Sequence, residues 1–80
     1  MTYVDAKEKQ ARDMVGKRVE IPVHYDMWMR GARFGRVVGL SWEYGSGQKV
    51  IRAIRVKMEH PQVKRLVKIA RIDFDYVTIR

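Results

Sequence analysis

Short runs of alternating polar and apolar residues, separated by turn-forming residues, constrain the fold of this chain more than any other feature. In residues 17–23, for example, Val19, Ile21 and Val23 alternate with polar residues and would share one face of a strand. The same reasoning predicts strands at residues 17–23, 34–43, 49–58, 63–70 and 76–79. Five short strands in an 80-residue chain, with regular turn signals between them, are typical of a small antiparallel barrel.

Turn signals join the central strands into two hairpins. The sequence Tyr-Gly-Ser-Gly at residues 44–47 suits a tight turn, because its glycines accept positive backbone angles. Residues 59–62 turn the chain again, and pairing that is symmetric about this turn would place Lys57 directly opposite Lys64. Residues 71–75 are too short for a strand and indicate a tight helical turn before the last strand.

A short amphipathic helix precedes the strands. Thr2 followed by Asp5 resembles a capping pair at its start, and Gly16 suits its end because glycine readily adopts the left-handed conformation. The apolar side of this helix would consist of Val4, Ala11, Met14 and Val15. We therefore expect residues 1–16 to form a helix that packs on a barrel made by residues 17–80.

Residues 30–40 contain three arginines and three glycines where a loop turns into a strand. Gly31 and Gly35 can adopt conformations closed to other residues and permit close approach of another backbone or a ligand. The arginines are Arg30, Arg33 and Arg36. On a bent segment we expect these three side chains to point into one shared patch, and guanidinium donors in such a patch suit phosphate.

The predicted order of elements is helix, strand, long loop, two hairpins, helical turn and final strand, and it resembles that of SH3-like barrels. Within that group, Gly35-Arg36-Val37-Val38-Gly39-Leu40 is similar to the Gly-x-Val-x-x-hydrophobic pattern of KOW-type domains, which occur in ribosomal proteins and transcription elongation factors. The resemblance implies a mainly β fold over residues 17–79: a five-stranded SH3-like antiparallel barrel with a short N-terminal α-helix.

The chain carries a net charge of +8, with 17 Lys and Arg residues against nine Asp and Glu residues. The charges cancel within residues 1–15, so the remainder of the chain holds the whole excess. A domain this basic attracts polyanions, with nucleic acid as the leading partner and an anionic membrane surface or an acidic protein behind it.

The third and fourth predicted strands concentrate this charge. No acidic residue occurs in residues 48–58 or in residues 62–72. The cations of the two stretches that we expect on the outer face are Arg52, Arg55, Lys57, Lys64, Arg65 and Lys68. Two neighbouring strands without carboxylates form a stripe of one sign, which suits a phosphate backbone.

Aromatic residues are interleaved with the arginines of the long loop and the second strand. They are Tyr25, Trp28, Phe34, Trp42 and Tyr44. Aromatic rings beside guanidinium groups supply stacking for bases and charge for the backbone of a single strand. We expect Trp28 and Tyr25 to stack on bases, with the alternative that Trp28 covers the open side of the barrel, and we expect Phe34, at the start of a strand, to lie in the core.

The sequence carries no pattern for catalysis, a cofactor or a metal. No nucleophile, acid and base arrangement and no phosphate-binding glycine loop with its lysine is present. His24 and His60 lie beside Asp26 and Glu59, but their spacing matches no recognised metal site. We therefore expect a non-catalytic protein without cofactor or metal.

Cysteine is absent, which fits a reducing cytoplasm, and no apolar run approaches the roughly 18 residues of a membrane span. We expect a cytoplasmic protein without a membrane partner.

These observations predict a nucleic-acid-binding module of low sequence specificity. Its expected binding residues are Arg30, Arg33, Arg36, Arg55, Lys57, Lys64, Lys68, Trp28 and Tyr25. RNA or single-stranded DNA is favoured over duplex DNA, because no recognition helix is evident and loop aromatics suit unpaired bases. The alternatives are a protein-interaction module of the SH3 or Tudor type and an assembly component joined through strand edges; the oligomeric state stays open.

Overall fold

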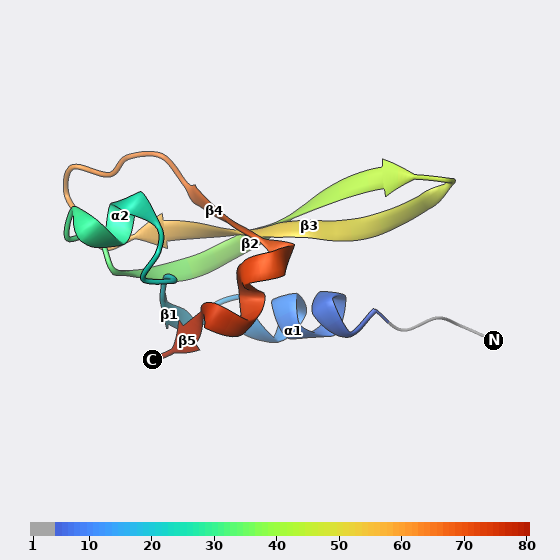
Figure 1. Ribbon diagram of the computed structural model, residues 1–80, viewed down its shortest axis with the longest axis horizontal. Coiled ribbons are helices and arrows are strands. Elements are labelled where there is room, and N and C mark those ends of the chain that lie inside the picture. The colour runs from blue at the N-terminus through green and yellow to red at the C-terminus, as the bar shows by residue number, and fades with distance from the viewer. Residues whose placement is uncertain (1–4) are drawn as a thin grey trace.

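A long hairpin of two strands organises the structure, a computed structural model that describes residues 5–80 (Figure 1). The elements are α1 (Ala6–Met14), β1 (Arg18–Glu20), α2 (Asp26–Met29), β2 (Phe34–Gly45), β3 (Gln48–Met58), β4 (Val67–Ala70), the 3-10 helix η1 (Arg71–Tyr76) and β5 (Thr78–Ile79). The five strands form one antiparallel sheet in the order β4-β3-β2-β1-β5, which confirms the mainly β prediction. Within residues 5–80 the edge strands β4 and β5 do not pair, so closure into a barrel is not confirmed.

The hairpin of β2 and β3 closes through the predicted turn. Gly45 pairs with Gln48, and the two residues between them have positive φ, 50° at Ser46 and 73° at Gly47. Two bulges interrupt the ladder, because Val38 in β2 and Arg52 in β3 have no partner in the register. Each bulge shifts the alternation by one residue and so changes which side chains face the core.

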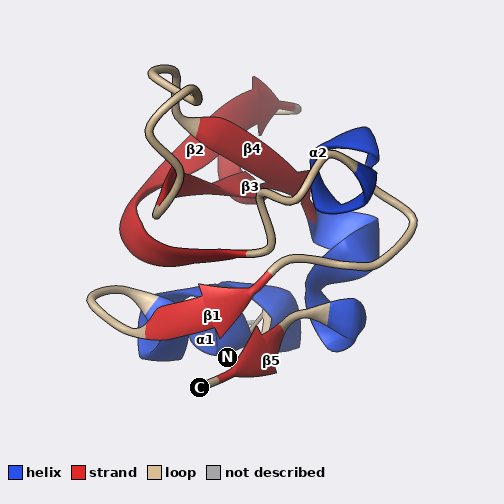
Figure 2. Ribbon diagram, turned by 90° about the vertical axis from the view of Figure 1, so that its left-hand side faces the viewer, coloured by secondary structure: helices blue, strands red, loops and turns tan. Residues whose placement is uncertain are grey.

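The core lies between the hairpin and a second layer formed by β1, β5 and α1 (Figure 2). Its fully buried side chains include Val19, Val37, Ile51, Ile54, Val56, Ile69 and Phe74. Ile51 and Ile54 both face inward because the Arg52 bulge lies between them. The predicted inward set of the third strand, Ile54, Val56 and Met58, is confirmed.

Helix α1 forms where the sequence predicts it. The Asp5 side chain accepts a hydrogen bond from the Lys7 backbone N–H at 3.0 Å, and the chain leaves the helix through Gly16 at φ 84°. Ala11 and Met14 are buried in the core, whereas Val15 is exposed. The other predicted cap and stripe residues, Thr2 and Val4, lie outside the described residues.

Three strands are shorter than predicted: β1, β4 and β5, of which β5 begins only at Thr78 because η1 extends to Tyr76. β1 ends at Glu20, just before Pro22, which has no N–H to donate to a ladder. β4 begins at Val67, because residues 59–66 form a loop and the register pairs Lys68 with Arg55. The predicted pairing of Lys57 with Lys64 is therefore wrong.

Two short helical elements lie between strands of the sheet. The predicted helical turn is present as η1, which buries Phe74. Helix α2 lies inside the segment that was predicted as a long loop.

Candidate functional site

The outer face of the sheet, opposite the core, carries two adjacent rows of basic residues. In the first row Arg36 pairs with Lys57, and in the second Arg55 pairs with Lys68. Because opposite residues in a ladder share a face, the four side chains form one contiguous surface, here called the basic face. Arg36, Lys57 and Lys68 are exposed and Arg55 is half-buried.

Like charges that lie opposite each other in a ladder destabilise it. The basic face contains two such pairs, side by side. Arg36 donates from Nη1 to the backbone oxygen of Gly16 at 2.6 Å, and the Arg55 guanidinium lies against Gly39. No residue of the basic face forms an ion pair with a carboxylate in the described part of the chain.

The carboxylates form ion pairs with other cations, one of which, Arg18, lies directly opposite Arg36 in the ladder. Arg18 makes a two-pronged contact with Glu59, at 2.8 Å and 3.0 Å, and this contact lowers the pKa of Glu59. Other ion pairs join Asp5 with Arg71, Glu8 with Arg12, Glu20 with Arg80 and Asp75 with Lys7. In residues 5–80 none of the seven cations predicted to bind phosphate takes part in an ion pair.

The arginines of residues 30–36 do not form the shared patch that the sequence predicts. Arg30 lines a pocket, Arg33 lies over the Trp28 ring with its Cζ 4.0 Å from the centroid, and Arg36 belongs to the basic face. Gly31, at φ 95°, turns the chain directly after α2, and regular strand alternation begins only at β2. The three side chains therefore leave the backbone from three different local structures.

Trp28 is built into the fold. Its indole N–H donates to Glu20 Oε2 at 3.1 Å, and Glu20 also accepts hydrogen bonds from Arg80. The ring packs against the core while Arg33 covers part of it. Trp28 thus links α2 to β1 and to the end of the chain.

Tyr25 has a similar linking position. Its hydroxyl donates to Asp73 Oδ2 at 2.6 Å and accepts from the Ala70 backbone N–H at 3.1 Å. Burial, together with the bond to Asp73, raises the pKa of Tyr25 to about 12. The hydroxyl therefore ties the loop before α2 to both β4 and η1.

The sequence predicts Phe34 in the core, but in the structure Phe34 lies outside it. The Arg18 guanidinium lies over its ring at 4.6 Å, and Phe34 is opposite Glu20 in the ladder. Its place in the alternation of β2 puts it on the same face as Arg36. The core prediction for Phe34 is therefore wrong.

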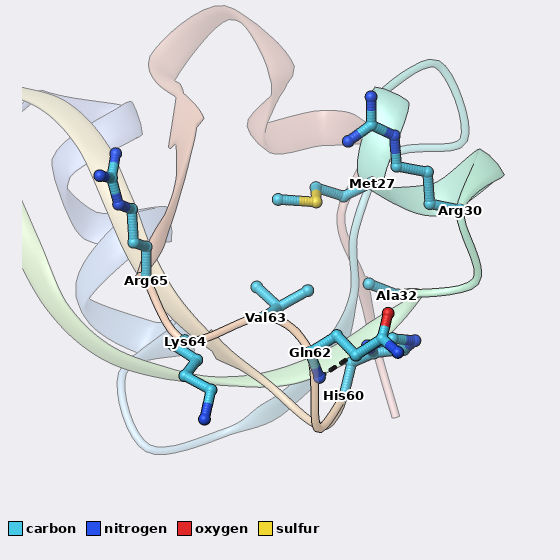
Figure 3. Close-up of a pocket in the computed structure, with 8 residues that line it drawn as sticks. All are labelled: Met27, Arg30, Ala32, His60, Gln62, Val63, Lys64 and Arg65. Carbon is cyan, nitrogen blue, oxygen red and sulfur yellow. Dashed lines mark hydrogen bonds between the residues drawn. The ribbon is translucent and has the colours of Figure 1, made fainter.

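A pocket of about 410 Å³ opens between α2 and the loop that joins β3 to β4 (Figure 3). It is lined by Met27, Arg30, Ala32, His60, Gln62, Val63, Lys64 and Arg65. Arg30 and Lys64 are predicted binding residues, and both line the pocket, with the Lys64 side chain directed away from Arg30. The other lining residues are not among the expected binding residues. One of them, Arg65, follows Lys64 in the stretch of residues 62–72 that contains no acidic residue.

No cluster of three or more His, Cys, Asp or Glu residues that could hold a metal occurs among residues 5–80. His24 contacts Asp73, at 3.1 Å, rather than its sequence neighbour Asp26. The same residues contain no helix with the length and apolar character needed to span a membrane.

Comparisons with protein-family models, with curated proteins and with solved structures find no match for the chain.

Proposed function

We propose that this protein is a non-catalytic nucleic-acid-binding module whose basic face contacts the phosphate backbone. The observation that carries the proposal is the juxtaposition of two like-charge pairs, Arg36 with Lys57 and Arg55 with Lys68, none of which forms an ion pair with a carboxylate within residues 5–80. A bound polyanion would convert the repulsion within each pair into attraction for a shared partner.

The sheet geometry supports a contact with backbone rather than with base edges. The longest described helix, α1, has nine residues and buries Ala11 and Met14 in the core, so it supplies no recognition helix for a major groove. Flat rows of Arg and Lys neutralise phosphates without reading sequence. We therefore propose low sequence specificity.

The same proposal includes an SH3-like arrangement. Support comes from the strand order β4-β3-β2-β1-β5 and from the 3-10 helix between β4 and β5. The KOW-like stretch of residues 35–40 lies in β2, and it contributes Arg36 to the basic face and the glycine against which Arg55 packs.

Fluorescence anisotropy with labelled single-stranded and duplex oligonucleotides tests the function. With four phosphates contacted, the logarithm of the association constant should fall with the logarithm of salt concentration with a slope of about −3 to −4. The triple variant Arg36→Gln, Lys57→Gln, Lys68→Gln should reduce this slope by about 2 to 3.

The matched control for this experiment is Arg12→Gln, which removes one cation that already has a carboxylate partner, Glu8. Its slope should equal that of the wild type. Binding that does not respond to salt, or that survives intact in the triple variant, would refute the proposal. Affinity for an acidic peptide without affinity for oligonucleotides would support a protein-interaction module instead.

A further inference from the structure

The pocket between α2 and the β3–β4 loop combines an apolar interior with a cationic rim. Met27 and Val63 are partly buried residues that pack against the core, and Ala32 is buried beside them. Figure 3 shows Arg30 and Arg65 on opposite sides of the pocket, with the Met27 side chain between them. Among the described residues, none that lines the pocket is a carboxylate.

We propose that this pocket binds one unpaired nucleotide, with the base against Met27 and Val63 and the phosphate at the cationic rim. The inference rests on the proposed function and adds to it the means by which a single strand is preferred. A paired base is stacked inside a duplex, so only an unpaired base can enter a pocket of this kind.

The chemistry of the lining fits both parts of a nucleotide. A volume of about 410 Å³ lies in the range of sites for small molecules, which are mostly apolar with a few polar groups that fix orientation. Arg30, Lys64 and Arg65 form no ion pair in the described part of the chain, and their donors suit phosphate oxygens. An apolar interior flanked by cations matches a flat base joined to an anion.

Polar groups for the base edge come from the loop. The Gln62 backbone N–H donates to His60 Nδ1 at 3.3 Å, so in the neutral ring the proton resides on Nε2, which is then a donor. The Gln62 side-chain amide supplies a donor and an acceptor. These groups can satisfy the edge of a base that has lost its pairing partner.

The pocket lining is also connected in sequence to the basic face. Lys64 and Arg65 lie in the loop that leads directly into β4, which carries Lys68. Figure 3 shows the Lys64 side chain directed away from Met27 and Arg30, on the outer side of the loop. A strand with one base in the pocket could therefore extend its backbone toward Lys68.

A titration of the full chain followed by NMR of its backbone amides tests the inference directly. The probes are adenosine 5′-monophosphate, ribose 5-phosphate and inorganic phosphate. Adenosine 5′-monophosphate should shift the amide signals of Ala32, Gln62 and Val63, and it should bind at least about fivefold more tightly than ribose 5-phosphate.

Variants separate the rim from the interior. Arg30→Gln combined with Arg65→Gln should weaken the binding of adenosine 5′-monophosphate about tenfold or more. Val63→Thr, which keeps the side-chain shape, should weaken adenosine 5′-monophosphate but not ribose 5-phosphate. Arg12→Gln, at an exposed arginine of α1 outside the pocket lining, should change neither, and amide spectra of every variant establish that it is folded.

Equal affinity for adenosine 5′-monophosphate and ribose 5-phosphate, or tighter binding of a phosphoserine peptide, would overturn the inference. Binding measurements with oligonucleotides distinguish a failure of the pocket inference from a failure of the proposed function. If only the pocket inference fails, Arg30→Gln with Arg65→Gln leaves the ratio of single-strand to duplex affinity unchanged while salt-dependent binding persists. If the proposed function fails, oligonucleotides show no salt-dependent binding at all, whatever the mononucleotide does.

Discussion

Arg55 crosses β2 over Gly39, and its Cζ lies 3.0 Å from the point where a Cβ at residue 39 would stand. The two residues are directly opposite in the register. The Arg55 Nε is buried without a hydrogen-bond partner among the described residues. Gly39 thus provides the space that the Arg55 guanidinium occupies.

This relationship predicts an energetic coupling between residues 39 and 55 in a double-mutant cycle. Gly39→Ala in the wild type should leave the free energy of unfolding within about 0.5 kcal/mol, because displacing Arg55 offsets the usual gain from replacing a strand glycine. In an Arg55→Ala background the same substitution should stabilise by about 0.5 to 1 kcal/mol. Urea denaturation of the four proteins measures both values, and equal effects in the two backgrounds would contradict the packing argument.

Gly35 has a more rigid environment than Gly39. A Cβ there would lie 2.6 Å from the Lys57 backbone oxygen and 3.0 Å from the Met58 Cα. Because backbone atoms cannot swing aside, Gly35→Ala should lower the free energy of unfolding by about 2 to 3 kcal/mol in urea denaturation. Gly45→Ala is the matched control, since a Cβ at Gly45 meets nothing within 4 Å, and its effect should stay below about 0.5 kcal/mol.

Local patterns made the strands and turns predictable from the sequence. The alternation of Ile54, Val56 and Met58, and the glycines of residues 44–47, each act through neighbouring residues and are confirmed in β3 and its turn. The two bulges escaped prediction, because they depend on how β2 and β3 fit together rather than on either strand alone.

In the candidate site, too, the features set by local sequence were predictable and those set by contacts between elements were not. Strand alternation correctly placed Arg55, Lys57 and Lys68 on the outer face, since side-chain direction in a strand is a local property. The separation of Arg30, Arg33 and Arg36 was not predictable, because it depends on the turn at Gly31 and on the position of α2. The pocket likewise joins α2 to a loop about 30 residues later in the chain, and no local pattern encodes that contact.

Tyr25 gives a prediction about stability at alkaline pH. Tyr25→Phe removes the bonds to Asp73 and Ala70 and should lower the free energy of unfolding by about 1 to 3 kcal/mol near neutral pH. The pKa of Tyr25 in the folded protein, about 12, exceeds the ordinary value of 10.0, so its contribution is complete below pH 10.0 and is lost as the pH rises toward 12. The free energy of unfolding, measured by denaturation from pH 8 to pH 12, should therefore decline less steeply in the variant, because the variant lacks the hydroxyl whose pKa differs between the folded and unfolded states.

The control for that experiment is Tyr76→Phe. The Tyr76 ring contacts His24 edge-on, but its hydroxyl makes no hydrogen bond within residues 5–80. Its removal should change stability by less than about 0.5 kcal/mol. Equal losses from the two tyrosine variants would contradict the linking role of Tyr25.

Acid should destabilise the protein through its ion pairs. Arg80 and Trp28 lower the pKa of Glu20, and Arg71 lowers that of Asp5, below the ordinary values of 4.5 and 3.8. A lowered pKa in the folded state means that the stabilisation is present above these values and is lost as the pH falls through and below them. Glu20→Gln should flatten this acid decline in thermal unfolding from pH 6 to pH 2, whereas Glu43→Gln, at an exposed residue of the hairpin without an ion pair in the described chain, should not.

The like-charge pairs of the basic face predict opposite changes in stability and in binding. Lys57→Gln should raise the free energy of unfolding by about 0.2 to 1 kcal/mol at low salt, because it removes the repulsion of Arg36, and high salt should abolish the gain. The same variant should reduce the salt slope of oligonucleotide binding by about 0.7 to 0.9. Arg12→Gln should do neither: it loses the Glu8 pair, which costs about 0.3 kcal/mol, and leaves binding unchanged. Two results would contradict these expectations. If Lys57→Gln is less stable than the wild type at low salt, Lys57 and Arg36 do not repel each other. If its salt slope for oligonucleotide binding equals that of the wild type, Lys57 does not contact phosphate.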